Sequence, residues 1–356
     1  MINVGFIGAG ANTRNAHIPK LLEQKGVVAY GVANRTYKSG EVVAKEFGIE
    51  NVYNSWEELL DDENIDAVCI GTWPNMHSTL SIRSLEMNKH VLCEARMATN
   101  SLEAEQMFEA SKNYPNLITQ IVPAPHTLPY DNTVKSWIKN EMGSLILFDV
   151  KCTTGEFPNY NKPLHWREDR DISGNNIMHM GIFYEAGMRW LGTASNVFAH
   201  SDVHVKKRKD ESTGEQKEIS IPDHLEAIGN MTCGGSYHMT HSTILGGSSP
   251  VDIYIYGTEG TLHIFTDNEV KTKQAFNSSK LRLESIKPKQ NKWKVLSPKK
   301  SEVGGWRVEE EFVSAINGKE KISHTSFSDG LKYMQFTDAL KISSESNKKV
   351  YLPLTK

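Results

Sequence analysis

The first third of the chain alternates short apolar runs with segments of helical periodicity. The apolar runs occupy residues 2–7, 27–33, 65–70, 90–93 and 117–122. Strands covered on both faces read as continuous apolar runs, and strands that alternate with helices form parallel sheets. The pattern therefore predicts an α/β fold built on a doubly wound parallel sheet. Ser55 and Ser101 are the expected N-caps of two of its helices.

The pattern changes where Pro123, Pro125 and Pro129 mark a domain boundary. One helix is expected at 130–143. The runs after it alternate apolar and polar residues, which predicts an antiparallel sheet, and residues 256–264 read as a tight hairpin. We therefore expect two domains, residues 1–122 and residues 123–356.

Composition and charge exclude several classes of partner. The chain has 356 residues and a formal net charge of −3, which argues against nucleic acid. Its Lys-rich tracts at 206–218 and 287–300 are interpreted as solvated hairpin loops. No apolar run approaches the roughly 20 residues of a membrane span. His200, Asp202 and His204 alternate along a strand, where a solvated face is favoured over metal ligation, so no metal is expected.

Two further features favour a cytoplasmic protein. The chain starts directly with an expected strand and has no basic leader. Its four cysteines are sparse and form no CxxC pair, which favours buried free thiols in a reducing compartment.

A glycine pair follows the first expected strand. Gly8 would allow a tight turn, and Gly10 would let the backbone approach a pyrophosphate at the start of the next helix. Thr13 stands where the third glycine of such a motif is usual. Because the pair opens a strand–helix–strand unit, it predicts a dinucleotide-binding Rossmann domain, with Asn12, Thr13 and Arg14 near the cofactor.

The end of the second strand bears on the choice of cofactor. Asn34 replaces the acid that usually binds the adenosine ribose, and Arg35 follows it, with Lys38 close in sequence. A guanidinium can bind a 2′-phosphate, whereas a carboxylate would repel it. The pattern favours NADP. NAD remains the alternative, with a solvated Arg35 and a ribose-bound Asn34.

Five stretches together resemble the Gfo/Idh/MocA (glucose–fructose oxidoreductase / inositol dehydrogenase) family, in that family's order. They are "GFIGAG", "IDAVCIGTWPNMHSTLSIRSLEMNKHVLCEA", "LPYDNTVKSWIKNEMGSLILFDV", "ISGNNIMHMGIFYEAGMRWLG" and "SFSDGLKYMQFTDALKISSESNKKVYLP". The resemblance implies a C-terminal α/β domain on an open-faced, mostly antiparallel sheet that joins copies into a homodimer or homotetramer. It also implies that a sugar or polyol binds in a cleft beside a nicotinamide. We place on the cofactor side Thr72, Trp73, Pro74, His77 and Glu94.

The chain departs from this family where catalysis is expected. The family usually has Glu-Lys-Pro after the strand at 90–93; here Glu94 matches, but Ala95 replaces the lysine and Arg96 the proline. In the second signature His179 stands at the usual aspartate and Phe183 at the usual histidine. The usual lysine, aspartate and histidine are therefore all substituted.

Other residues are candidates for the missing chemistry. His179 is the preferred acid/base because an imidazole titrates near neutrality, although a structural histidine weighs equally. Tyr184 is a second candidate, for which core packing is favoured. Asn175 and Asn176 share a helix face with His179 and could hold sugar hydroxyls.

The loop at 157–169 leads into this helix and suits a lid. Trp166 could stack on a sugar, His165 donate a proton, and Arg167 pair with a carboxylate. Together with Arg96, Arg167 suggests an acidic sugar as substrate. A packing loop is the alternative of equal weight.

These observations predict an NAD(P)-dependent oxidoreductase that acts on the CH–OH group of a sugar, sugar acid or polyol. One alternative is nicotinamide-assisted glycoside cleavage, in which oxidation, elimination and reduction leave no net redox change. The other is a nucleotide- or sugar-sensing regulator without catalysis, which the three substitutions would permit.

Overall fold

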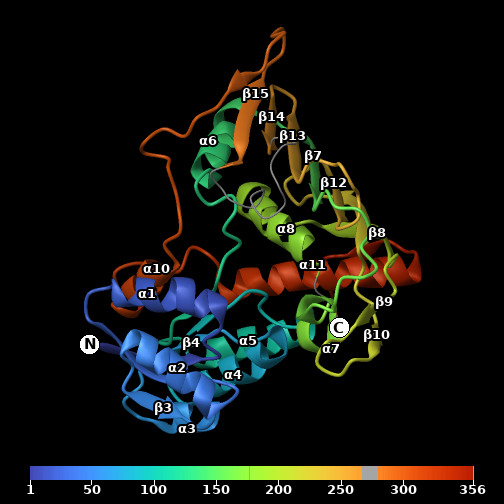
Figure 1. Cartoon of the computed structure of the whole chain (residues 1–356). Helices are drawn as coiled ribbons and strands as arrows, with labels where there is room; N and C mark the ends of the chain where they lie inside the picture. Colours follow the sequence, from blue (N-terminus) through green and yellow to red (C-terminus); the bar gives the residue numbers. More distant parts are fainter. Residues whose placement is uncertain (176, 267–279, 356) are drawn as a thin grey trace. The chain divides into compact units, whose positions relative to one another are not determined.

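The computed structural model describes residues 1–175, 177–266 and 280–355. Its contacts divide the chain into two compact units (Figure 1). Unit 1 consists of Met1–Pro123, Asp171–Gly174 and Arg307–Met334, and unit 2 of Ala124–Arg170, Asn175–Trp306 and Gln335–Lys356. The first boundary adjoins the proline-rich segment. Two later segments, Asp171–Gly174 and Arg307–Met334, also belong to unit 1, and no pattern in the sequence indicates this.

Unit 1 is built on a six-stranded parallel sheet in the order β3-β2-β1-β4-β5-β6. The strands are β1 (Ile2–Ile7), β2 (Val27–Ala33), β3 (Asn51–Tyr53), β4 (Ala67–Ile70), β5 (His90–Cys93) and β6 (Thr119–Ile121). This confirms the predicted doubly wound sheet. From β1 the chain adds β2 and β3 on one side and then β4, β5 and β6 on the other, so the strand order reverses between β1 and β4. Ligands of such sheets bind at the carboxyl ends of the strands beside that point.

The helices of this unit follow the strands as predicted. They are a π-helical turn η1 (Thr13–His17) with α1 (Ile18–Leu22), then α2 (Tyr37–Phe47), α3 (Trp56–Asp61), α4 (Pro74–Glu86) and α5 (Ser101–Asn113). Ser55 caps α3 as predicted. Helix α5 begins at Ser101, but its N-cap is Asn100 and not the predicted Ser101, because the side chain of Asn100 accepts the bond from the backbone of Glu103 at 2.9 Å.

The C-terminal part of the chain returns to unit 1. Helix α10 (Val308–Ile316) packs against α1 (Figure 1). Ile121 and Thr325 exchange backbone hydrogen bonds of 2.9 and 3.3 Å, which tie the segment after α10 to β6. Helix α11 (Phe327–Ser346) follows, and its residues up to Met334 belong to unit 1.

Unit 2 contains a nine-stranded sheet in the order β16-β15-β14-β13-β7-β12-β11-β8-β17. The strands are β7 (Leu145–Thr153), β8 (Asn196–Asp202), β11 (His224–Asn230), β12 (Ser236–Ser242), β13 (Val251–Gly257), β14 (Thr261–Phe265), β15 (Arg282–Ile286), β16 (Lys294–Val295) and β17 (Val350–Tyr351). All neighbours are antiparallel except β7 and β12, which run parallel. The sheet is therefore mostly antiparallel, as predicted, and β13 and β14 form the predicted hairpin.

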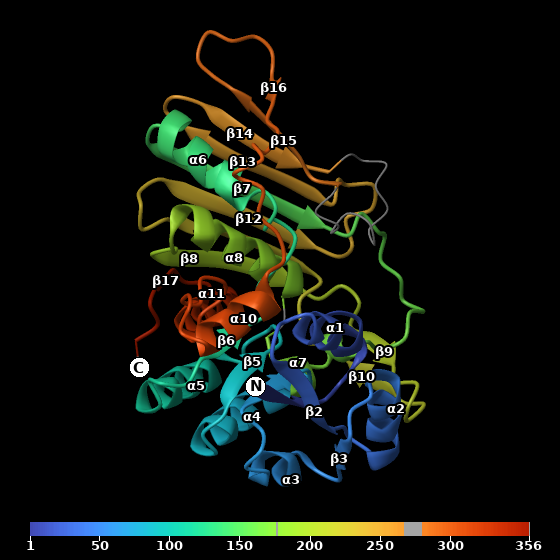
Figure 2. The ribbon, with the colours of Figure 1, turned by 90° about the vertical axis from the view of Figure 1, so that its left-hand side faces the viewer.

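Two helices of unit 2 lie on the same side of this sheet (Figure 2). Helix α8 (Met178–Leu191) packs against β7, β12 and α6 (Asp131–Glu141). The 206–218 tract forms the small ladder of β9 (Lys207–Lys209) and β10 (Gln216–Glu218), which confirms a hairpin there. A 3-10 turn η2 (Trp166–Glu168) and the short helix α7 (Arg170–Ser173) precede α8 in the chain. None of the helices in the described ranges is both long and apolar enough to span a membrane.

Candidate functional site

A pocket of about 760 Å³ opens at the carboxyl ends of β1, β2 and β4 in unit 1. It is lined by the ends of β1 and β2, by the loops that follow β1, β2, β3 and β4, and by parts of α2, α3 and α4: Ile7, Gly8, Ala9, Gly10, Ala33, Asn34, Arg35, Ser39, Asn54, Ser55, Trp56, Glu57, Gly71, Thr72, Trp73, Asn75, Met76 and Leu80. This is the place where the strand order predicts a ligand. The pocket brings together the glycine pair, the residues after β2 and Thr72 with Trp73.

The glycine loop is shaped for a close approach of backbone and ligand. Gly8 has a φ of +76°, and a Cβ there would lie 2.9 Å from the backbone nitrogen of Thr72. A Cβ on Gly10 would meet only the carbonyl oxygen of Gly8, at 3.9 Å, so this side of the loop is open. The buried Oγ1 of Thr72 has no hydrogen-bond partner among the described residues. These three features fit the pyrophosphate of a dinucleotide.

The loop after β2 forms the other end of the pocket. The side-chain oxygen of Asn34 accepts a hydrogen bond from the backbone of Ala9 at 2.7 Å, and its amide donates to the carbonyl of Ser39 at 3.1 Å. Asn34 therefore joins the glycine loop to the start of α2. Arg35 is exposed in the pocket lining, and Glu57 of α3 is the acid that shares this lining.

A buried histidine that the sequence analysis did not single out lies beside this site. His17, at the end of η1, is fully buried. Its Nε2 lies 2.9 Å from Oε1 of Glu94, and its Nδ1 lies 2.7 Å from Oε1 of Glu309 in α10. The amide of Asn12 donates to the same oxygen of Glu94. The backbone N–H of Ala95 donates to the other oxygen, Oε2, at 3.2 Å.

This contact pattern fixes the charge of the histidine. Two carboxylates on the two ring nitrogens require both nitrogens to donate, so His17 is an imidazolium. Burial alone would lower the His17 pKa, but hydrogen bonds to Glu309 and Glu94 and their charges raise it to about 9. Burial opposes ionisation of Glu94 too, yet the bonds and charge of His17 hold the Glu94 pKa below its ordinary value.

The turn after β5 is held from two directions. The buried ring of His77 lies 2.6 Å from the carbonyl oxygen of Arg96 and 3.1 Å from that of Thr72, so it joins the turns after β5 and β4. The guanidinium carbon of Arg96 lies 5.1 Å from the centre of the Tyr333 ring, and Arg96 is only 6% exposed. The hydroxyl of Tyr333 accepts a hydrogen bond from the backbone of Met97 at 2.7 Å.

The remaining residues placed on the cofactor side surround the same loops. Thr13 is buried, and its hydroxyl is directed at Gly71. Because Gly71 has no Cβ, there is room for this side chain where a third glycine is usual. Arg14 forms an ion pair with Glu46 of α2. Pro74 is the first residue of α4 and is buried.

In unit 2 the predicted substrate residues have structural partners of their own. The amide nitrogen of Asn175 donates to the carbonyl of Thr337 at 3.0 Å, and its oxygen accepts from Arg170 at 3.3 Å. Asn176 and the side chain of His179 lie outside the described part of the chain.

Tyr184 lies in the core of unit 2. It is 2% exposed, and its ring stacks on that of Phe336 at 3.5 Å between centroids. Its hydroxyl accepts a hydrogen bond from the backbone of Ala194 at 3.0 Å, and burial raises its pKa. These contacts are those of a packing residue. Phe183 is equally buried and lies against the ring of His126.

The predicted lid residues form a compact turn at η2. The side chain of His165 accepts from the backbone of Arg167 at 3.3 Å, and Glu168 accepts in return from the backbone of His165 at 3.0 Å. The guanidinium of Arg167 lies 4.2 Å above the ring of Trp166. Burial holds the pKa of His165 below its ordinary value.

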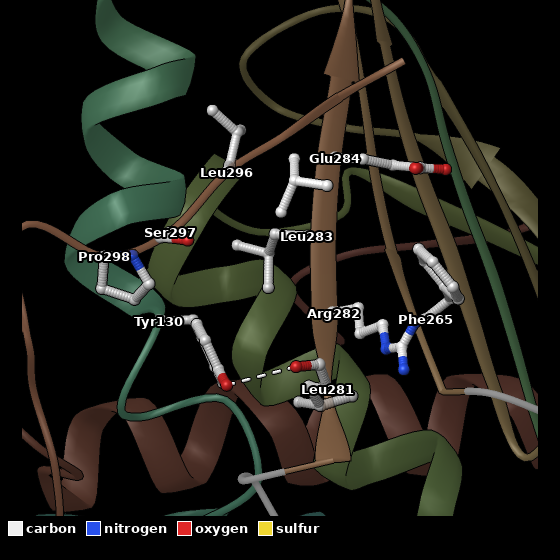
Figure 3. A pocket seen from close by; sticks show the side chains of 10 residues that line it. Tyr130, Phe265, Leu281, Arg282, Leu283, Glu284, Leu296, Ser297 and Pro298 are labelled. Atoms are coloured by element: carbon white, nitrogen blue, oxygen red, sulfur yellow. Dashed lines mark hydrogen bonds between the residues drawn. The ribbon is translucent and has the colours of Figure 1, made fainter.

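A second pocket, of about 390 Å³, lies in unit 2 beside β15 and β16 (Figure 3). Its lining includes Leu281, Leu283 and Leu296, and the hydroxyl of Tyr130 donates to the carbonyl of Leu281 at 3.2 Å. None of the residues predicted from the sequence lines it. The described residues contain no cluster of three His, Cys, Asp or Glu side chains suited to a metal ion.

Comparison with known proteins identifies the family of the chain. Residues 2–120 match "Oxidoreductase family, NAD-binding Rossmann fold" and residues 135–352 match "Oxidoreductase family, C-terminal alpha/beta domain", the two parts of one family. An uncharacterised oxidoreductase of Rhizobium meliloti is 28% identical over 57% of this chain and 60% of its own length. The levoglucosan dehydrogenase of Pseudarthrobacter phenanthrenivorans is 23% identical over 78% of this chain and 76% of its own.

Solved structures share the fold over nearly the whole chain. An NAD-binding oxidoreductase from Klebsiella pneumoniae has a TM-score of 0.83 at 22% identity, covering 99% of this chain and 100% of its own. A levoglucosan dehydrogenase in complex with NADH and levoglucosan has the same TM-score, 0.83, at 19% identity, with coverage of 99% and 100%. The two matched domains together span most of the sequence, and the chain therefore belongs to the Gfo/Idh/MocA oxidoreductase family.

Proposed function

We propose that this chain transfers a hydride between a nicotinamide cofactor and the CH–OH group of a sugar, sugar acid or polyol. The observation that carries the proposal is the pocket at the ends of β1, β2 and β4, whose open glycine loop and buried Thr72 hydroxyl fit a dinucleotide. Relatives named as a levoglucosan dehydrogenase and an aldose-aldose oxidoreductase support a carbohydrate substrate.

The bound cofactor would supply the hydride acceptor or donor, and residues of this chain would supply binding and the proton. Gly8, Gly10 and Thr72 would hold the pyrophosphate, and Glu94 would accept a hydrogen bond from the nicotinamide-side ribose. The amine usual at the position of Ala95 is missing, so we assign the proton transfer to His179 of α8. Tyr184 is left out of this role because its hydroxyl is engaged in the core.

We further propose that the preferred cofactor is NADP. Arg35 and Ser39 both line the pocket, Arg35 is exposed, and residues 34–40 after β2 include no acid that would repel a 2′-phosphate. Glu57 lines the same pocket, and its negative charge would weaken the preference for NADP over NAD. Titration of the purified chain with NADPH and NADH tests this, and tighter binding of NADH would contradict it.

We propose that the substrate is acidic and that the guanidinium of Arg167 binds its carboxylate. Arg96 was the second cation expected to bind it, but Arg96 is buried against Tyr333, so the contact is assigned to Arg167 alone. Replacement of Arg167 by Ala should raise KM for a uronate by about tenfold to a hundredfold, since a charged hydrogen bond contributes ~1.5–3 kcal/mol. The same variant should leave KM for an uncharged sugar unchanged; equal KM values for the uronate in variant and parent would refute the assignment.

The face of the unit 2 sheet that carries Tyr254, His263 and Phe265, all half-buried, supports a homodimer or homotetramer. Tyr254, His263 and Phe265 form a continuous stack on it, with ring centroids 4.1 and 4.3 Å apart. Aromatic rows of this kind are enriched at protein interfaces. Light scattering of the full chain and of a His263→Glu variant tests this proposal, which predicts a smaller species for the variant. We also propose a cytoplasmic location, in line with Cys69, Cys93 and Cys152 being buried free thiols.

A panel of sugars, uronates, polyols and aryl glycosides tests the proposed activity. The full chain is incubated with each compound and oxidised cofactor, and both reduced cofactor and product sugars are measured. Reduced cofactor that accumulates with an oxidised sugar supports the proposal. Released aglycone without net reduction indicates glycoside cleavage, and binding without any product indicates a sensor.

A further inference from the structure

The cluster of His17, Glu94 and Glu309 joins helix α10 to the end of β5. Glu309 comes from the C-terminal segment that returns to unit 1, while His17 and Glu94 come from the first 94 residues of the chain. The side chain of Glu309 is 2% exposed and that of His17 is completely buried, whereas the Glu94 side chain is 15% exposed. Glu94 is therefore the member of the cluster that a ligand can reach.

The hydrogen bonds of Glu94 distinguish its two carboxylate oxygens. Oε1 accepts hydrogen bonds from the imidazolium of His17 and from the amide of Asn12. Oε2 accepts a hydrogen bond from the backbone N–H of Ala95, and no second donor to it is found among the described residues. A carboxylate oxygen can accept more than one hydrogen bond, so Oε2 retains capacity for a ribose hydroxyl. The donors on Oε1 fix the direction in which Oε2 points.

We propose that Glu309 and His17 are positioning residues for the dinucleotide, and that they orient Glu94 toward the nicotinamide-side ribose. The carboxylate of Glu309 compensates the buried imidazolium, and the imidazolium holds Oε1 of Glu94. Helix α10 thereby contributes to cofactor binding without touching the cofactor. This inference rests on the proposed function, because Glu94 has a ligand to hold only if the pocket binds a dinucleotide.

Helix α10 offers a matched control. Glu311, two residues after Glu309, is also buried, at 4% exposure. It accepts hydrogen bonds from Gln120 at 3.0 Å and from the backbone of Ser323 at 2.9 Å, and it has no contact with His17 or Glu94 among the bonds described. Replacement of either glutamate by Gln exchanges one buried carboxyl group of the same helix for an amide, so damage to folding should be similar in the two variants.

The experiment measures affinity for whole and half ligands in the full chain. Glu309→Gln and His17→Gln are titrated with NADPH and with 2′,5′-ADP, which carries the adenosine half only. We expect both variants to bind NADPH about tenfold more weakly, as expected for loss of one charge-assisted contact. Both should bind 2′,5′-ADP as the parent does, because its site is formed by the loop after β2. Glu311→Gln should bind both ligands within about twofold of the parent.

The two ligands separate the possible outcomes. Full NADPH affinity in Glu309→Gln and His17→Gln would overturn the proposal, and so would an equal loss of NADPH and 2′,5′-ADP binding, which indicates a general structural effect. An equal NADPH loss in Glu311→Gln would overturn it as well. A parent chain that binds neither ligand would instead overturn the proposed function itself.

Discussion

His17 and Glu309 are separated by 292 positions in the chain, yet a hydrogen bond of 2.7 Å joins them inside unit 1. The bond connects the helix that follows the glycine loop to a helix near the C-terminus. Through the second nitrogen of His17 it extends to Glu94 at the end of β5. The turn after β5 is therefore supported by a segment that adjoins it only in the folded chain.

The charge of His17 predicts a pH-dependent stability. Its pKa is raised from 6.5 to about 9 in the folded state, so protonation favours folding. The contribution is complete below pH 6.5 and is lost as the pH rises through about 9. Its full size is about 3 kcal/mol, since each unit of pKa corresponds to ~1.4 kcal/mol. Urea unfolding at several pH values should show a decline across this window in the parent.

The control for this prediction is His17→Gln, which cannot titrate. Other histidines, such as His263, whose pKa is also raised, are common to parent and variant. The difference between the two free-energy curves therefore isolates His17. Parallel curves from pH 6.5 to 9 would show that His17 does not gain a proton on folding.

Replacement of Gly8 by Ala should abolish tight cofactor binding. A Cβ at this positive-φ position would lie 2.9–3.0 Å from the backbone of Thr72 and would displace the loop. Gly48 is the matched control, because it has a φ of +68° with nothing within 4 Å of an added Cβ. Gly48→Ala should cost only the ~1 kcal/mol of a left-handed residue.

Thermal unfolding and NADPH titration of both variants check this prediction. Gly8→Ala should lower both Tm and affinity, with the affinity reduced more than about tenfold. Gly48→Ala should lower Tm alone. Unchanged NADPH affinity in Gly8→Ala would show that the loop does not approach the cofactor.

Arg35 should determine the preference between the two cofactors. Arg35→Ala removes a guanidinium that would bind the 2′-phosphate, a contact that contributes ~1.5–3 kcal/mol. NADPH affinity should fall by about tenfold to a hundredfold, whereas NADH affinity should stay the same. Lys45→Ala, in the last turn of α2 and outside the pocket lining, controls for the loss of one positive charge. The prediction fails if Arg35→Ala and Lys45→Ala change the NADPH dissociation constant equally.

Tyr184 should act through packing. Tyr184→Phe keeps the stack on Phe336 but leaves the backbone N–H of Ala194 without its acceptor, at a cost of about 1–3 kcal/mol. Tyr237→Phe is the control, because the buried hydroxyl of Tyr237 likewise bonds to the backbone, at Asn196. Both variants should lose stability and keep kcat. A loss of kcat confined to Tyr184→Phe would indicate a role in proton transfer.

Local patterns predicted most of the secondary structure and the dinucleotide loop. Continuous apolar runs indicate buried parallel strands, and Gly8 lies at the end of one of them, so both features follow from neighbours in the sequence. Helix α11 gave no such signal. Its buried residues, among them Phe327, Met334, Phe336 and Ala339, are spread around the helix, so no single apolar stripe marks it.

The support of the site depends on contacts between distant segments, which periodicity does not reveal. Glu309 stands in a run of three glutamates that resembles an exposed helix start, and nothing local shows that it is buried against His17. The sequence predicts Arg96 as a cation near the substrate, and no local pattern shows that it packs against Tyr333, far away in the chain. For His17 the available signal was its place in the helix that follows the glycine pair.

Transfer of a labelled hydride tests the proposed function most directly. The full chain is incubated with NADPH that carries deuterium at both hydrogen positions of C4 of the nicotinamide and with the oxidised form of each sugar in the panel. The proposed function predicts that the label appears on one carbon of the reduced sugar, found by mass spectrometry in parallel with consumption of NADPH. A product without label, or binding of NADPH with no labelled sugar from any member of the panel, would contradict it.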